Sequence, residues 1–232
     1  MSTLGDICAV ACADLFRGDG AIMASPMAPI PRLGVLLARK TFAPDLVLSD
    51  GIATLVDDDG KPEGWMPFSR VFDTLWNARR HVVMGASQID RHANQNLSCL
   101  GDHARPKVQL LGSRGAPGNT VCHTTSYWVP DHSTRVFVPD VDFVSGVGMA
   151  RGAAEIRRIV TNLCVMGVSA TDGCIRLVSV HPGVTLEKVI ESTGFAMHIP
   201  DHVPATRAPH ADEAALLELL DPGAKIRGTV TA

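Results

Sequence analysis

The chain contains 232 residues with a formal net charge of −3, and 46% of the residues are hydrophobic and 19% are charged. This length is enough to bury a sizeable core, so we expect residues 1–232 to form one domain. The slight negative charge argues against a nucleic-acid partner, which requires a basic face. No segment approaches the roughly 20 apolar residues of a membrane-spanning helix, and the N-terminus has no signal-peptide pattern, so we expect no membrane association and a cytoplasmic location.

The first half of the chain alternates helical patterns with short apolar strands. Thr3 and Asp6 predict a capped helix that ends before Gly18, and Pro31 predicts the first turn of a second helix. Such alternation is typical of a parallel sheet covered on both faces, so we predict an α/β fold with a buried, mostly parallel sheet flanked by helices. The predicted strands are 21–24, 46–48 and 81–84, and a third helical face is predicted on Val71, Phe72, Leu75 and Trp76.

The second half is predicted to be richer in strands. Apolar stretches predict strands at 107–111, 135–138, 156–161 and 174–180, and helices at 185–192 and 212–220.

Other patterns are given structural interpretations. The acidic run Asp57–Gly60 predicts a solvated turn, because no converging ligand set accompanies it, and no C-x-x-C pair or third dinucleotide-binding glycine is present. Neither a metal nor a nicotinamide cofactor is therefore expected. The arginine pairs 79–80 and 157–158 are interpreted as solvated ends of secondary-structure elements.

Three polar segments carry the most specific signal. Gly85–Asn96 (GASQIDRHANQN) follows a strand, and Leu111–Ala116 (LGSRGA) and Val180–Glu187 (VHPGVTLE) follow further along the chain. Together they resemble the β subunit of class I coenzyme A transferases, and the resemblance implies that fold. In that family a glutamate in a Glu-Ser-Gly or Glu-Asn-Gly turn attacks the acyl-CoA carbonyl. The corresponding turn here reads Ser49-Asp50-Gly51, so the expected nucleophile is absent.

The serine changes the expected chemistry. A serine cannot form the mixed anhydride and glutamyl thioester that a carboxylate nucleophile allows. Asp50 is one position along and one methylene shorter, which makes it a poor substitute in a reaction sensitive to fractions of an ångström. The resemblance therefore implies that a homologous α subunit supplies the catalytic glutamate, in an α2β2 assembly. No catalytic residue is assigned with certainty to this chain.

The remaining site residues are expected to bind substrate. Glycines in the loop after Leu111 let backbone N–H groups approach an oxyanion. Arg114 replaces a glycine of the family's Gly-Ser-Gly-Gly loop, where its guanidinium either binds a substrate carboxylate or forms an ion pair between subunits. Asp90 and Arg91 either shape the site floor or form a salt bridge, and Asn94 and Asn96 either stabilise the turn or contact substrate. The expected substrate-binding residues are Ser49, Gln88, Arg91, Asn94, Asn96, Arg114 and Gly115.

The resemblance also implies an activity. Within the family the chain is similar to β subunits of hydrolases that open a steroid-derived ring of an acyl-CoA by carbon–carbon cleavage, with coenzyme A as part of the substrate and no further cofactor. One alternative is a β subunit of an acyl-CoA transferase of the 3-oxoacid or glutaconate type, against which Ser49 argues. The other is a non-catalytic ligand-sensing or scaffold subunit, against which the unbroken Gly85–Asn96 segment argues.

Overall fold

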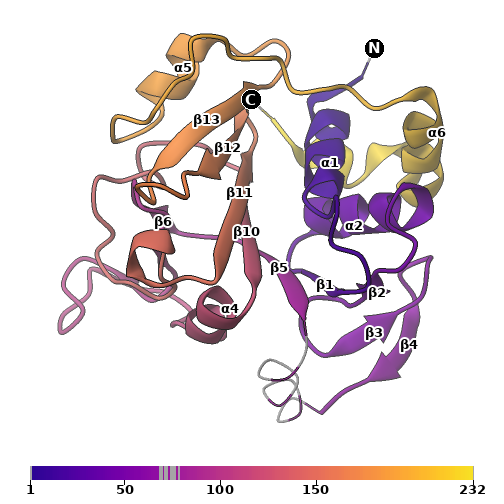
Figure 1. The fold of residues 1–232 in the computed structure, drawn as a ribbon, viewed down its shortest axis with the longest axis horizontal. Coiled ribbons are helices and arrows are strands. Elements are labelled where there is room, and N and C mark those ends of the chain that lie inside the picture. Colours follow the sequence, from indigo (N-terminus) through magenta and orange to yellow (C-terminus); the bar gives the residue numbers. More distant parts are fainter. Residues whose placement is uncertain (1, 68–69, 71–72, 74–76, 78, 232) are drawn as a thin grey trace.

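A seven-stranded sheet runs through the middle of the protein in the order β13-β12-β11-β10-β5-β1-β2 (Figure 1). The computed structural model describes residues 2–67, 70, 73, 77 and 79–231. The strands are β1 Met23–Pro26, β2 Val47–Leu48, β3 Thr54–Val56, β4 Pro62–Trp65, β5 Arg80–Met84, β6 Gln88–Ile89, β7 Gln95–Asn96, β8 Cys99–Leu100, β9 Val108–Gln109, β10 Thr124–Val129, β11 Glu155–Thr161, β12 Cys164–Val168 and β13 Ile175–Val180. The helices are α1 Leu4–Asp14, α2 Pro29–Thr41, α4 Ala116–Cys122, α5 Leu186–Glu191 and α6 Ala211–Leu220, with 3-10 turns at Met149–Arg151, Pro222–Ala224 and Arg227–Thr229.

The central sheet is mostly parallel. Strands β2, β1, β5, β10 and β11 pair in parallel, and β12 and β13 extend the sheet in antiparallel fashion. Strand β5 is buried along its whole length, as a strand covered on both faces must be. The predicted α/β fold with a buried, mostly parallel sheet is therefore confirmed.

Helices α1, α2 and α6 cover one end of the sheet (Figure 1). As predicted, Thr3 and Asp6 form a reciprocal capping box that starts α1, and proline lies in the first turn of α2. The two helices approach closely at Gly34, where an added Cβ would lie 2.8 Å from the Cβ of Cys12. Among the described residues, no helix is both long enough and apolar enough to cross a membrane.

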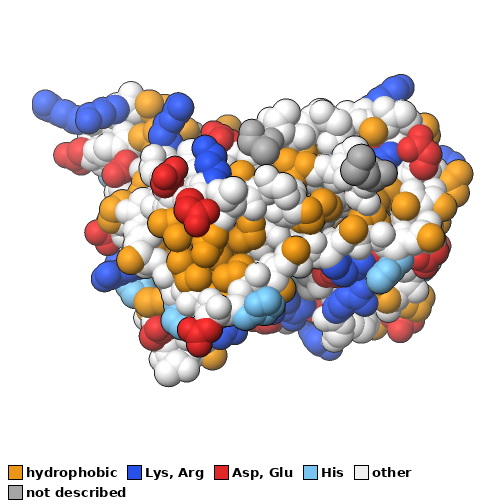
Figure 2. All heavy atoms as spheres, turned by 90° about the horizontal axis from the view of Figure 1, so that it is seen from above, with side chains coloured by type: hydrophobic (Ala, Val, Ile, Leu, Met, Phe, Trp, Pro, Cys, Tyr) orange, Lys and Arg blue, Asp and Glu red, His pale blue; other side chains and the backbone are white. Residues whose placement is uncertain are grey.

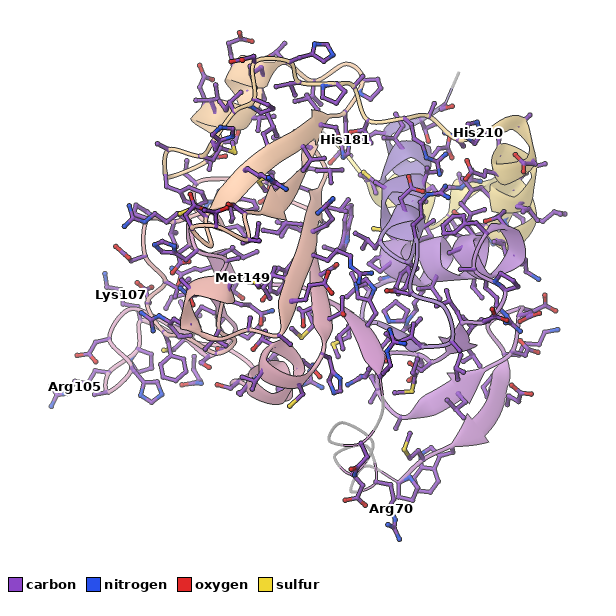
Figure 3. The ribbon with its side chains drawn as sticks, viewed as in Figure 1. Arg70, Arg105, Lys107, Met149, His181 and His210 are labelled. Atoms are coloured by element: carbon purple, nitrogen blue, oxygen red, sulfur yellow. The ribbon has the colours of Figure 1, made fainter. Side chains whose placement is uncertain are left out.

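A second core lies at the β10–β13 end of the sheet. Its largest fully buried side chains include Tyr127, Phe137 and Ile159. Hydrophobic side chains also gather on the outer surface of this half, where α5 lies uppermost and Ile190 is 45% exposed (Figure 2). His181 lies between the sheet and α1, where its Nε2 is 2.8 Å from the carbonyl oxygen of Thr161 and 3.7 Å from the Cys8 sulfur (Figure 3). The two cores are thus joined by buried polar contacts.

Several predicted elements differ from those observed. The segment 135–138 forms a turn with an isolated bridge at Phe137, so the predicted strand is wrong, because these apolar residues anchor a loop into the second core. The predicted strand at 107–111 is reduced to two residues, and β10, β12 and α4 were not predicted. The acidic turn 57–60 lies in the unpredicted hairpin β3–β4, and the third predicted helical face falls outside the described residues.

Acidification is expected to destabilise the fold through His132, which is 4% exposed. Burial lowers the pKa of His132 to about 4, so the folded state favours the neutral ring, whereas the unfolded chain gains a proton near pH ~6.5. This stabilisation is therefore complete above pH ~6.5 and is lost as the pH falls towards 4. The whole shift corresponds to roughly 3 kcal/mol.

Urea unfolding across this pH range measures the effect. In His132→Gln, which cannot gain a proton at this position, the free energy of unfolding should fall less steeply with pH than in the wild type. Equal slopes in the two proteins would contradict the assignment.

Candidate functional site

The turn that holds Ser49 directly follows β2, and its hydroxyl group is fully engaged in hydrogen bonds. Ser49 is 8% exposed, and its Oγ donates to the carbonyl oxygen of Ala24 at 2.8 Å. Because this uses its one hydroxyl proton, Oγ is the acceptor in its 3.1 Å contact with Ser25 Oγ and its 3.3 Å contact with the Gly51 N–H. No base faces the Ser49 hydroxyl, so this serine is not an activated nucleophile.

Asp50 stabilises the same turn. Its Oδ1 accepts backbone N–H groups of Ile52, Ala53 and Thr54 at 2.8, 3.0 and 3.0 Å. Burial opposes ionisation, but these backbone hydrogen bonds outweigh it and hold the pKa of Asp50 below its usual value. The carboxylate is therefore ionised but fixed within the loop, which supports its expected weakness as a nucleophile.

The glycine of this turn cannot be replaced without strain. Gly51 has φ +84°, and an added Cβ would lie 2.3 Å from the carbonyl oxygen of Pro26. We expect Gly51→Ala to lower the free energy of unfolding by about 2–4 kcal/mol, from left-handed backbone strain together with overpacking. Gly183→Ala is a matched control, since Gly183 has φ +86° with nothing within 4 Å. Thermal unfolding of both variants separates the two effects, and equal losses would contradict the close approach.

A buried arginine extends the hydrogen-bond network from this turn to α4. Arg80 is 4% exposed, which corrects the interpretation of the 79–80 pair as solvated. Its Nε donates to Ser25 Oγ at 2.6 Å, its Nη1 to Asn119 Oδ1 at 3.0 Å, and its Nη2 to the carbonyl oxygen of Gly51 at 3.5 Å. The Ser49 turn is therefore connected to the Gly-rich loop, because Gly115 is the N-terminal cap of α4 and Asn119 lies one turn later.

The segment after β5 is held mainly by its own side chains. Asp90 accepts the His92 and Asn94 N–H groups at 2.9 and 3.0 Å and the Asn94 side-chain amide at 2.8 Å. Asn94 in turn accepts the Gly148 N–H at 2.9 Å. Asp90 therefore stabilises the loop through Asn94, and Arg91, whose Nε donates to His92, is not its salt-bridge partner. Turn stabilisation is the role that these contacts give to Asn94.

Asn96 and Gln88 are committed in the same way. The Asn96 amide donates to Gln88 Oε1 at 2.7 Å and to the Cys99 carbonyl oxygen at 2.6 Å, and its oxygen accepts the Ser98 N–H at 2.9 Å. Gln88 donates to Asp142 at 3.0 Å. Contact of these two side chains with substrate stays a prediction, but it would require them to break bonds within the chain.

The Gly-rich loop lies beside this segment. Ser98 Oγ is 2.9 Å from Ser113 Oγ, and the Gly112 N–H donates to the carbonyl oxygen of Leu97 at 3.2 Å. Arg114 is exposed and has φ 49°, a left-handed conformation that favours glycine. The departure from glycine therefore carries a conformational cost, while the guanidinium forms no ion pair with a carboxylate in the described part of the chain.

The structure brings together only part of the predicted site. Ser49, Arg114 and Gly115 are linked through Asn119 and the loop that precedes it. Arg91 is not placed with them, because its carbonyl oxygen accepts the N–H of Ile175 at the start of β13, and β13 and β2 are the two edges of the sheet. With about 4.8 Å between neighbouring strands, these edges lie roughly 29 Å apart. In this chain alone, Arg91 and Ser49 do not share a pocket.

A buried Ser–His–Asp arrangement lies on the opposite face of the sheet and was not predicted. His81 Nε2 is 2.9 Å from Ser126 Oγ, and its Nδ1 is 2.7 Å from Asp19, which also pairs with Arg157 at 2.5 Å. Ser126 and His81 have no exposed surface, so no substrate reaches them. We conclude that the arrangement is structural, and that the 157–158 pair is not simply solvated. Within the described ranges, no group of three or more His, Cys, Asp or Glu residues is placed to hold a metal ion.

Comparison with known proteins identifies the class. The chain is 31% identical to the β-type polypeptide of a 3-oxoadipate CoA-transferase from Pseudomonas knackmussii, over 83% of this chain and 84% of that one. No protein-family model matches it. The chain belongs to the coenzyme A transferase family, as a β-type subunit.

Within this family a more specific similarity emerges. The chain is 49% identical to the cholesterol ring-cleaving hydrolase IpdB subunit of Mycobacterium tuberculosis, over 96% of each chain. It superposes on the structure of Rhodococcus jostii IpdAB with a TM-score of 0.92 and 45% identity, covering 99% of this chain and 98% of that one. The resemblance predicted from the three polar segments is confirmed. Because these relatives are subunits of heteromeric proteins, an α-subunit partner is implied.

Proposed function

We propose that this chain is the β subunit of a heteromeric hydrolase that opens a steroid-derived ring of a coenzyme A thioester by hydrolytic carbon–carbon cleavage. The observation that carries the proposal is the 49% identity, over 96% of the chain, to an IpdB subunit of a cholesterol ring-cleaving hydrolase. We further propose that the homologous α subunit supplies a catalytic glutamate in an α2β2 assembly, and that coenzyme A enters only as part of the substrate.

The proposed reaction places modest demands on this chain. Water adds to a ring ketone, and the resulting alkoxide collapses by breaking the bond to the carbon next to the thioester carbonyl. The electron pair of that bond is stabilised as an enolate and then protonated. The α subunit's carboxylate removes the proton from water, while Ser49 and the Gly-rich loop line the pocket and present hydrogen-bond donors to developing negative charge.

The transferase alternative lacks a nucleophile in this turn. Ser49 donates its proton to a backbone carbonyl, and the Asp50 carboxylate is held by three backbone N–H groups. Acyl transfer through a mixed anhydride requires a free carboxylate at this position. The arrangement therefore favours the hydrolase.

The test is co-expression with the neighbouring α subunit. The chain alone is expected to be inactive, and the purified heteromer to hydrolyse a cyclic β-keto acyl-CoA with ring opening, detected as a mass increase of one water. Adding a free carboxylic acid separates the alternatives: transfer of coenzyme A to that acid would establish the transferase and contradict the hydrolase.

Replacement of Ser49 by alanine is expected to leave most of the catalytic machinery working. We expect kcat/KM to fall about tenfold, because the hydroxyl only shapes the pocket wall, whereas loss of the α subunit's glutamate should abolish turnover. Steady-state kinetics of the heteromer measures both effects. An acyl adduct trapped on Ser49 and detected by mass spectrometry would contradict this role.

A further inference from the structure

The guanidinium of Arg80 is a buried positive charge without a carboxylate partner. Its three acceptors, Ser25 Oγ, Asn119 Oδ1 and the Gly51 carbonyl oxygen, are all neutral. No ion pair joins it to any described aspartate or glutamate. The residues outside the described set include no aspartate or glutamate. The chain therefore supplies no carboxylate side chain to this arginine.

Other buried arginines in this protein are paired. Arg227, with 6% exposure of its side chain, forms ion pairs with Asp6, Glu218 and Asp221 at 2.6, 2.9 and 3.2 Å. Arg80 is buried to a similar degree with no such partner, and burial lowers its pKa to about 10 while leaving it protonated near neutral pH. Charged side chains are almost never fully buried unless they are paired, because an uncompensated buried charge costs several kcal/mol. An anion from outside this chain would remove that cost.

The unused donors of Arg80 suggest which anion fits. A guanidinium has five N–H groups, and the three hydrogen bonds use one on Nε and one on each terminal nitrogen. One N–H therefore remains on each terminal nitrogen, which matches the two oxygens of a carboxylate. A phosphate would present more oxygens than these two donors can satisfy.

The network around Arg80 fixes where this anion would lie. The chain of contacts from Arg80 Nε through Ser25 Oγ to Ser49 Oγ has steps of 2.6 and 3.1 Å. Ser25 and Ser49 face the same side of the sheet as Arg80, since side chains alternate along β1 and β5 and the register pairs Met23 with Arg80. The free donors thus lie beside the Ser49 turn.

We propose that Arg80 binds a carboxylate that this chain does not itself supply, next to Ser49. Two sources have this chemistry: a carboxyl group on the acyl part of the substrate, or an aspartate or glutamate of the α subunit. The substrate source rests on the proposed function, whereas binding of a carboxylate at Arg80 does not.

The experiment uses acetate as the probe on both the purified heteromer and the isolated chain. Thermal midpoints are measured in sodium acetate and in sodium chloride of equal concentration, for wild type, Arg80→Gln, Arg80→Lys and Ser49→Glu. Arg79→Gln is the matched control, because Arg79 is the exposed neighbour of Arg80. Ser49→Glu tests the site while retaining Arg80, because its carboxylate is long enough to occupy the site from within the chain. Complex formation is followed by size-exclusion chromatography.

A substrate source predicts that acetate raises the midpoint of the wild-type heteromer, that Arg80→Gln and Ser49→Glu lose this rise, and that Arg79→Gln keeps it. KM for the acyl-CoA should then rise at least tenfold in Arg80→Gln, by loss of a charge-assisted bidentate contact. An α-subunit source predicts instead that acetate stabilises only the isolated chain, and that Arg80→Gln weakens complex formation while Arg79→Gln does not.

Absence of an acetate effect on both wild-type forms, together with unchanged assembly of Arg80→Gln, would overturn the proposal. A crystal structure of the wild-type heteromer with only neutral oxygens around Arg80 would overturn it as well, even if Arg80→Gln fails to fold. Failure of the wild-type chain to join any α subunit would count against the proposed function, and the acetate titration of the isolated chain would still decide the role of Arg80.

Discussion

Replacement of Asp19 by asparagine is expected to lower the free energy of unfolding by about 3–5 kcal/mol, because it breaks a buried charge network from one side. The Asp19 side chain is 2% exposed, and its two oxygens contact His81 and Arg157 at 2.7 and 2.5 Å. Burial raises the cost of its charge, but the contacts with His81 and Arg157 outweigh this and hold its pKa below the usual value. The asparagine keeps the shape and leaves Arg157 without this partner.

Urea unfolding measures the loss, with Asp59→Asn as the control. Asp59 also contacts two cations, Lys40 and Lys61 at 3.2 and 3.6 Å, but on the surface, so its replacement should change stability little. Comparable effects of the two variants would contradict the importance of burial at Asp19.

The same network offers a separate check on its role. If Ser126, His81 and Asp19 are purely structural, Ser126→Ala should retain the kcat/KM of the heteromer, because no substrate reaches a serine with no exposed surface. Loss of activity in a stably folded Ser126→Ala heteromer would instead assign this buried arrangement a part in the chemistry.

The fold was largely predictable because its signals are local. The first capping box, the proline at the start of α2 and the apolar strands β5 and β11 are each encoded within a few residues. The errors occur where apolar residues serve tertiary packing. Val136 and Phe137 look like a strand but pack a loop into the second core, and α4 was missed because Pro117 and Gly118 weaken its helical pattern.

The site was less predictable because its contacts are long-range. Ser49 was found through the family motif, but Arg80 was interpreted as solvated. Its partners Ser25 and Asn119 lie 55 and 39 residues away in sequence, so no local pattern connects them. One signal was available: an arginine directly before an apolar strand lies where a side chain is drawn into the sheet as readily as into solvent. The asparagines of the Gly85–Asn96 segment were correctly singled out, although their hydrogen bonds are mostly internal.

Arg114 has the largest expected effect on catalysis. Its φ of 49° is a conformation that glycine adopts freely, so the arginine is held there at a cost of about 1–2 kcal/mol. If its guanidinium clamps a carboxylate or ketone oxygen of the substrate, Arg114→Gly should raise the free energy of unfolding by up to that amount while lowering kcat/KM. The loss should be about 2–4 kcal/mol in transition-state free energy, or roughly 30- to 1000-fold.

The nature of the contact is tested by Arg114→Lys, which should also impair turnover, because an ammonium group does not reproduce the planar two-pronged donor. Arg105→Ala is the control, since Arg105 is an exposed arginine that projects from the outer edge of the molecule (Figure 3). If Arg114 instead pairs with a carboxylate at the interface between the subunits, Arg114→Ala should weaken assembly, and the heteromer that does form should keep its kcat/KM. Steady-state kinetics and size-exclusion chromatography on the same preparations separate these results, and an unchanged kcat/KM in Arg114→Gly would remove Arg114 from the substrate site.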